Sequence, residues 1–226
     1  MLFRSMANAN GVDLSALTAE QLDQLKQQLL HAGDVPLGRK KKARRKDTTK
    51  YLSEEQIDRF FRVIPNPRDV AMFRVIYHRG LRASEVGLLQ LADWNRERDR
   101  LRFSRLKGSH GGEYHLTSKE VRALRAWLKV RGVEPGPLFP SRKGKGISQQ
   151  MLDVLMKRYG KLAGLPAELC HTHTLKHSCA THLLNLELSI EDVQDHLGHA
   201  NIQSTLHYAK YSAKRRALKD QRLRDW

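Results

Sequence analysis

Four short segments of the sequence contain the residue types that acid–base and phosphate chemistry require. In residues 80–86, Gly-Leu-Arg-Ala-Ser-Glu-Val, an arginine after a glycine turn can project its planar guanidinium toward a phosphate. Glu85 lies one turn after Arg82 and can hold it in place. Lys107 precedes a glycine-rich stretch, and a loop can deliver such a lysine as a general acid. Each feature alone is more typical of an ordinary surface charge.

The third segment, residues 171–184, is rich in histidine. A helix that begins near residue 172 places Lys176 and His177 one turn beyond His173. His173 and His177 also have the i, i+4 spacing of zinc-binding helices. No glutamate follows His173 and no Cys-x-x-Cys pair is present, which makes zinc the weaker interpretation beside a set of capping and core histidines. We therefore predict no metal and no cofactor.

The fourth segment, residues 193–208, contains a histidine and a candidate nucleophile. A helix is expected to end at Leu197 with Gly198 as its C-terminal cap. His199 then begins the next element, and a short helix leads to Tyr208. A single tyrosine is usually a packing residue, and Tyr211 is a rival for any chemical role.

Hydrophobic periodicity and capping signals predict the elements that position these segments. Residues 1–37 contain one amphipathic helix at 13–31, residues 38–50 form a basic linker, and a main domain covers 51–226. Ser53 and Gln56 form a capping box. Alternation over 92–117 indicates a β-hairpin or short meander. Helices are expected at 53–64, 68–78, 83–89, 118–131, 148–162, 173–186, 189–196 and from 212. The predicted fold is mainly α with a small antiparallel hairpin or three-stranded sheet (α+β).

The charge of the chain points to a polyanionic partner. There are 41 Lys and Arg against 24 Asp and Glu, a net charge of +17, and the pI is near 10.2. Nucleic acid is the leading candidate, with a basic but inert surface as the alternative. A basic run without a hydrophobic anchor is expected to lie along phosphates or in a minor groove, with a solvated linker as the alternative. It consists of Arg39, Lys40, Lys41, Lys42, Arg44, Arg45 and Lys46.

Other features of the sequence favour a location in the cytoplasm. No apolar run is long enough to span a bilayer, so no membrane association is predicted. No secretory signal follows the first residues. Cys170 and Cys179 are too few for a disulfide framework, which favours a reducing compartment.

In this order, the four segments resemble the tyrosine recombinases of the phage integrase family. The resemblance covers roughly residues 51–226. It depends on Gly-Leu-Arg-Ala-Ser-Glu-Val, a hairpin lysine, His-x-x-Lys-His-Ser-x-Ala-Thr-His, and Leu-Gly-His with a tyrosine nine residues on. It implies a site-specific recombinase of integrase or inversion type that cleaves and rejoins DNA through a 3′-phosphotyrosine. Such an enzyme would act as a homo-oligomer on double-stranded DNA, in association with a bacterial or phage nucleoid.

The resemblance implies a role for each matching residue. The implied catalytic residues are Arg82, Lys107, His173, Lys176, His199 and Tyr208, with Glu85 and His177 in support. Arg82 would brace the scissile phosphate and Glu85 would orient it. Lys107 would protonate the leaving 5′ oxygen. His173 would serve as an acid/base and phosphate contact, and His199 as a hydrogen-bond donor in the transition state. Tyr208 would be the nucleophile, since Thr205-Leu206-His207 fits the family pattern before it.

Two departures from the family leave alternatives open. The second arginine of the family is Lys176 here, a point charge in place of a bidentate fork. The change could lower the rate, be tolerated, or mark an inactive DNA-binding remnant. Only about fifty residues precede the main domain, where the family usually has a separate helical DNA-binding domain. This indicates a short inversion-type enzyme, a remnant or a shortened form. A type IB topoisomerase-like enzyme shares the tyrosine chemistry and is a further alternative.

Overall fold

The computed structural model describes residues 51–106 and 111–209, with single positions near both ends of the chain. The chain divides into two units, Met1–Asp47 and Thr48–Trp226, and the second unit contains the four candidate segments. Several predictions lie outside the described residues. They are the basic run at 38–46, Lys107, Tyr211, and most of the helices at 13–31 and from 212.

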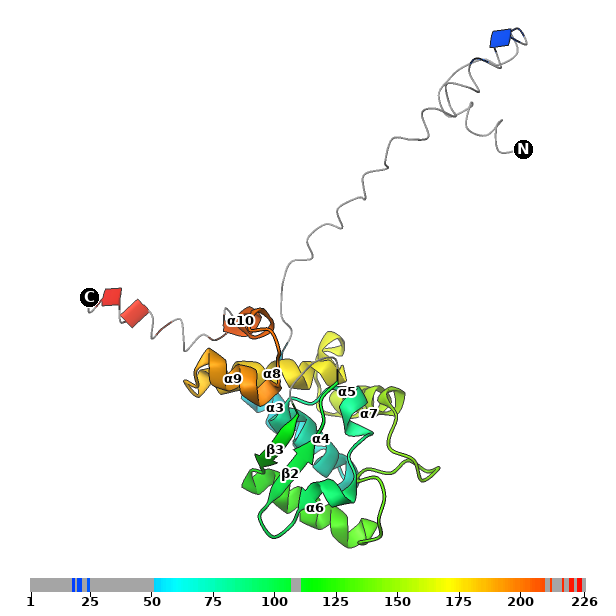
Figure 1. Cartoon of the computed structure of the whole chain (residues 1–226), viewed down its shortest axis with the longest axis vertical. Coiled ribbons are helices and arrows are strands. Elements are labelled where there is room, and N and C mark those ends of the chain that lie inside the picture. The colour runs from blue at the N-terminus through cyan, green and yellow to red at the C-terminus, as the bar shows by residue number, and fades with distance from the viewer. Residues whose placement is uncertain are drawn as a thin grey trace. The chain divides into compact units, whose positions relative to one another are not determined.

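The described part of the second unit is mainly helical and contains one small sheet (Figure 1). Its elements are α3 (Glu54–Arg62), α4 (Pro67–Arg79), α5 (Ala83–Val86), η4 (Leu91–Asp93), β1 (Trp94–Asn95), β2 (Arg100–Phe103), β3 (Gly112–His115), α6 (Ser118–Arg131), α7 (Gln149–Leu162), η5 (Ala167–Leu169), α8 (Thr172–Asn185), α9 (Ile190–Leu197) and α10 (Gln203–Ala209). The predicted fold class is confirmed. No helix among the described residues combines the length and apolar character needed to cross a bilayer.

The sheet is an antiparallel meander in the order β1-β2-β3. Leu101 on β2 pairs with Trp94 on β1 and with Tyr114 on β3. The side chains of Leu101 and Phe103 face the core, whereas the intervening Arg102 is exposed, as the alternation predicted. Lys107 follows β2 in the sequence, between β2 and β3.

Local capping signals fix the ends of the helices. The Ser53 hydroxyl accepts from the Gln56 amide at 3.2 Å, and the Gln56 side chain accepts from the Ser53 amide at 2.8 Å, so the predicted capping box is confirmed. Gly80 and Gly198 end α4 and α9 in the left-handed conformation, with φ of 56° and 61°. The helix expected over 83–89 is shorter, because it ends at Val86 and Gly87 then lies against the backbone of Ile147.

Most of the buried apolar residues form one cluster, and a smaller cluster joins α8, α9 and α10. In Figure 1 these three helices lie together at one end of the unit. Cys179, Leu184, Val193 and Leu197 belong to the smaller cluster, and so does Tyr208, which is 4% exposed. The candidate nucleophile is therefore packed into the core rather than displayed on the surface.

Gly80 has a second role beyond its backbone conformation, because α4 and α9 approach each other there. A Cβ at this position would overlap the side chain of Leu197, which is fully buried. We expect Gly80→Ala to lower the free energy of unfolding by about 2–4 kcal/mol, from the left-handed backbone plus overpacking. Chemical denaturation of the full chain measures this loss.

Gly164 is a matched control, since its φ is 64° and a Cβ at this position would have no other atom within 4 Å. Gly164→Ala should therefore cost only about 1–2 kcal/mol, the cost of the backbone conformation. Equal losses in the two variants would show that the contact between Gly80 and Leu197 is not tight.

Candidate active site

The chain turn after α4 presents Arg82 at the start of α5, with Glu85 beneath it. The Glu85 carboxylate is fully buried and accepts hydrogen bonds from the Arg82 guanidinium and the Arg82 amide, both at 2.8 Å. It also accepts from the Leu106 amide at 3.1 Å. The Arg82 side chain remains 25% exposed. One carboxylate thus orients the arginine and also binds Leu106, three residues after the end of β2.

Lys176 is buried behind this turn and is 2% exposed. Its Nζ donates to the carbonyl of Gly80 at 2.8 Å and to that of Leu197 at 3.3 Å. Two of the three ammonium donors are therefore bound to protein. Burial, together with the nearby Arg105 and Arg82 guanidinium groups, lowers the pKa of Lys176 to about 7.

Two of the predicted histidines, His177 and His199, lie beside the Tyr208 ring, as does its chain neighbour His207. His177 Nδ1 lies 2.8 Å from the Tyr208 hydroxyl oxygen, and a neutral imidazole protonated on Nε2 accepts the phenolic proton there. The His199 ring is nearly parallel to that of Tyr208, with centroids 6.4 Å apart. His199 Nδ1 is hydrogen-bonded to the Thr205 hydroxyl at 2.9 Å, which fixes the orientation of the imidazole. His173 packs edge-on against His177, with centroids 4.4 Å apart.

The local environment sets the charge state of each of these groups. Burial raises the pKa of Tyr208 to about 12, so its hydroxyl keeps its proton at neutral pH. Burial, with Lys176 and Arg82 close by, lowers the pKa of His199 to about 3. Burial and the neighbouring His173 lower the pKa of His177 to about 4. Both imidazoles are therefore neutral near pH 7.

The structure brings most of the predicted residues into one cluster. The charges of Lys176 and Arg82 act on both His173 and His199, and Tyr208 contacts His177 directly. Across the described ranges, no three His, Cys, Asp or Glu side chains are grouped as metal ligands. Lys107 and the basic run at 38–46 are not among the described residues, so their positions stay predictions.

Sequence reasoning missed Arg105 and Thr205. Arg105 continues the inward alternation of Leu101 and Phe103, and its side chain has no exposed surface. A charged residue at an inward-facing position after a strand is unusual, and that signal could have identified it. Nothing in the sequence distinguishes Thr205 as the partner of His199.

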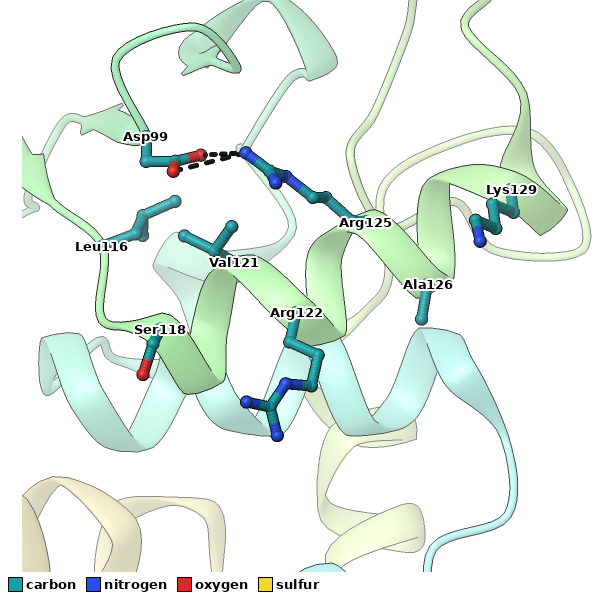
Figure 2. A pocket seen from close by; sticks show the side chains of 8 residues that line it. All are labelled: Asp99, Leu116, Ser118, Val121, Arg122, Arg125, Ala126 and Lys129. Carbon is teal, nitrogen blue, oxygen red and sulfur yellow. Dashed lines mark hydrogen bonds and ion pairs between the residues drawn. The ribbon is translucent and has the colours of Figure 1, made fainter.

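A surface hollow along α6 is separate from this cluster (Figure 2). Its lining residues are Asp99, Leu116, Ser118, Val121, Arg122, Arg125, Ala126 and Lys129. Arg125 reaches across it to Asp99, with a distance of 3.1 Å between nitrogen and oxygen. None of the predicted catalytic residues lines this hollow.

Most of the chain, including every segment of this cluster, matches one known protein family. Residues 50–215 match the family model described as the phage integrase family. The chain belongs to the phage integrase family. The type 1 fimbriae regulatory protein FimB of Escherichia coli K12, a family relative, is 34% identical over 152 residues, which cover 66% of this chain and 76% of FimB. The tyrosine recombinase XerC of Haemophilus ducreyi is 34% identical over 144 residues, 62% of this chain and 47% of XerC.

Solved structures of recombinases share the fold. The XerA recombinase matches with a TM-score of 0.64 at 25% identity, over 70% of this chain and 59% of that one. The site-specific recombinase XerH, in a post-cleavage complex with its palindromic difH substrate, matches with a TM-score of 0.65 at 25% identity. That match covers 74% of this chain and 51% of XerH. The matched region thus spans only half to three fifths of these recombinases.

Proposed function

We propose that this protein is a site-specific DNA strand transferase that uses Tyr208 as its nucleophile. The observation that carries the proposal is the 2.8 Å contact between the Tyr208 hydroxyl and a neutral His177, within one cluster that also contains Arg82 and His199. A phosphodiester needs a positioned nucleophile and fixed positive charge around its non-bridging oxygens. This cluster supplies both from the protein's own side chains.

In the proposed reaction, the Tyr208 oxygen attacks the phosphorus and the bond from phosphorus to the 5′ oxygen breaks. His177 Nδ1 takes the phenolic proton, and Lys107 gives a proton to the leaving 5′ oxygen. Arg82 holds one non-bridging oxygen, while His199 and His173 donate hydrogen bonds to the other. One phosphate ester replaces another, so the reverse attack by a 5′ hydroxyl rejoins DNA without an external energy source.

Lys176 occupies the place of the family's second arginine in this scheme. With two of its donors on backbone carbonyls, it contributes its charge and at most one hydrogen bond to the phosphate. A bidentate contact of the kind that arginine makes is not available to it. We propose that the basic run at 38–46 adds sequence-independent contacts to phosphates and that the active species on duplex DNA is a homo-oligomer.

Trapping on nicked duplexes tests this function. When the nick lies beside the cleaved bond, the short released strand diffuses away and the phosphotyrosine cannot be reversed. We expect the full chain to form a covalent adduct, resistant to denaturant, on a subset of a randomised nicked library. Salt-sensitive DNA binding without any adduct would instead indicate a non-catalytic DNA-binding protein. Relaxation of supercoiled DNA by a monomer would indicate a topoisomerase.

A further inference from the structure

Arg105 is a cation removed from solvent beside the candidate active site. Its side chain has no exposed surface, and it follows β2 at the inward-facing position after Phe103. A buried guanidinium is costly unless its donors are satisfied. Its two terminal NH2 groups have partners on other segments of the chain, which identify what it holds together, while its Nε has no hydrogen-bond partner among the described residues.

The guanidinium of Arg105 joins the last turns of two helices. Its NH2 group donates to the carbonyl of Arg79 at 2.9 Å and to that of His196 at 2.6 Å. Its NH1 group donates to the carbonyl of Gly80 at 3.3 Å and lies 4.0 Å from the Glu85 carboxylate. Arg105 therefore connects the ends of α4 and α9 with the carboxylate that orients Arg82.

Each segment that Arg105 joins carries a residue of the proposed reaction. Arg82 follows Gly80 by two positions, His199 follows His196 by three, and Lys107 follows Arg105 itself by two. Lys176 binds the same Gly80 carbonyl from α8. Lys176 binds two carbonyls through one nitrogen, whereas the two terminal nitrogens of Arg105 bind the carbonyls of Arg79, Gly80 and His196.

We propose that Arg105 is a positioning residue that holds the segments of Arg82 and His199 in register, in a chain that has Lys176 where the family has its second catalytic arginine. This role rests on the proposed function of the site. Arg105 touches no reacting atom and acts through the backbone carbonyls and Glu85. Displacements of about 1 Å at a catalytic group can cost a hundredfold in rate.

Arg79 provides a matched control. It is also a buried arginine at the end of α4, but its guanidinium forms a paired contact of 2.9 Å with Glu120 on α6, away from the site. The full chain and the variants Arg105→Met, Arg105→Lys and Arg79→Met are compared on one nicked duplex. Adduct formation is measured at saturating DNA, below the unfolding temperature of each variant.

We expect Arg105→Met to form the adduct about a hundredfold more slowly with little change in DNA affinity, and Arg105→Lys to recover about tenfold of this loss. Arg79→Met should stay within about threefold of the unchanged chain. If both Met variants fail to fold, Arg105→Lys and Arg79→Lys are compared instead. Adduct formation is again expected to be slower in the variant at position 105. Equal rates within either matched pair would overturn the proposal.

Amide hydrogen exchange in the absence of DNA separates this inference from the proposed function. In the Arg105 variants, exchange should accelerate at residues 79–85, 105–106 and 196–199, whereas the Arg79 variants should accelerate exchange mainly along α6. Accelerated exchange with no adduct from the unchanged chain would contradict the proposed function and leave the positioning role supported. Unchanged exchange at the three segments would refute that role even in an active enzyme.

Discussion

Tyr208→Phe is expected to abolish the covalent protein–DNA adduct while leaving DNA binding intact. The substitution removes only the oxygen that would attack phosphorus. The ring still fills its place in the small cluster of α8, α9 and α10, and one hydrogen bond to His177 is lost, which costs about 1 kcal/mol of stability. Denaturing gel electrophoresis after incubation with a nicked duplex measures the adduct, and filter binding measures the affinity.

Tyr211→Phe is the matched control, because Tyr211 lies three residues further along the chain and is the rival nucleophile. This variant should form the adduct at close to the unchanged rate. An adduct that persists in Tyr208→Phe and disappears in Tyr211→Phe would assign the chemistry to the other tyrosine. Peptide mapping of the adduct from the unchanged chain gives an independent assignment.

The rate of adduct formation is expected to fall as the pH rises above about 7, because Lys176 loses its positive charge there. Burial, followed by Arg105 and Arg82, lowers the pKa of Lys176 to about 7. The protonated form exists below this pH and stabilises the negative charge that builds on the phosphate. At subsaturating DNA, where the rate reports the free enzyme, each pH unit above the pKa should cost about tenfold.

The ionisable groups discussed below do not change their protonation state between about pH 6 and pH 9, where Lys176 titrates. Glu85 on α5 partly offsets the nearby cations, whereas burial raises the pKa of the Cys179 thiol on α8 to about 12, so that it carries no charge in this range. His177 and His199, with pKa values of about 4 and 3, are already neutral at pH 6, and Tyr208, with a pKa of about 12, stays protonated up to pH 9.

Lys176→Arg tests the assignment, because a guanidinium stays charged throughout this range. This variant should show a flat profile between pH 6 and 9, and the ratio of its rate to that of the unchanged chain should rise about fiftyfold from pH 7 to pH 9. An alkaline decline that is identical in Lys176→Arg would assign the titration to another group, with Lys107 as the first candidate.

The sequence was sufficient to predict nearly all of the described secondary structure, because the signals involved are local. The prediction for α6 matched the structure to the residue, Ser118–Arg131, since Thr117 caps its start and Gly132 follows its end. The expectation failed after Ala83, where Gly87 turns the chain against Ile147. That turn depends on a segment sixty residues away, and no local pattern contains this information.

For the candidate site too, the sequence predicted the residues but not the contacts that depend on the fold. The order of motifs located Arg82, Lys176, His199 and Tyr208, and the structure brings their segments together. The two carbonyls that bind Lys176 lie at Gly80 and Leu197, positions that become neighbours only when α4 and α9 meet. For this reason the sequence could raise the question of the missing arginine but could not show what the lysine contacts.

The meeting of α4 and α9 has an electrostatic consequence for an enzyme that must accept an anion. Both helices direct their C-termini to this point, so their macrodipoles place about half a negative charge each where a DNA phosphate would approach. Such an arrangement repels phosphate, in contrast to the helix N-termini that usually bind it. Lys176 and Arg105 sit on these carbonyls and neutralise them, so that the field at Arg82 can be attractive. Replacing either cation by a neutral residue would therefore remove its attraction for the phosphate and would also leave the repulsion between the helix C-termini and the phosphate uncompensated.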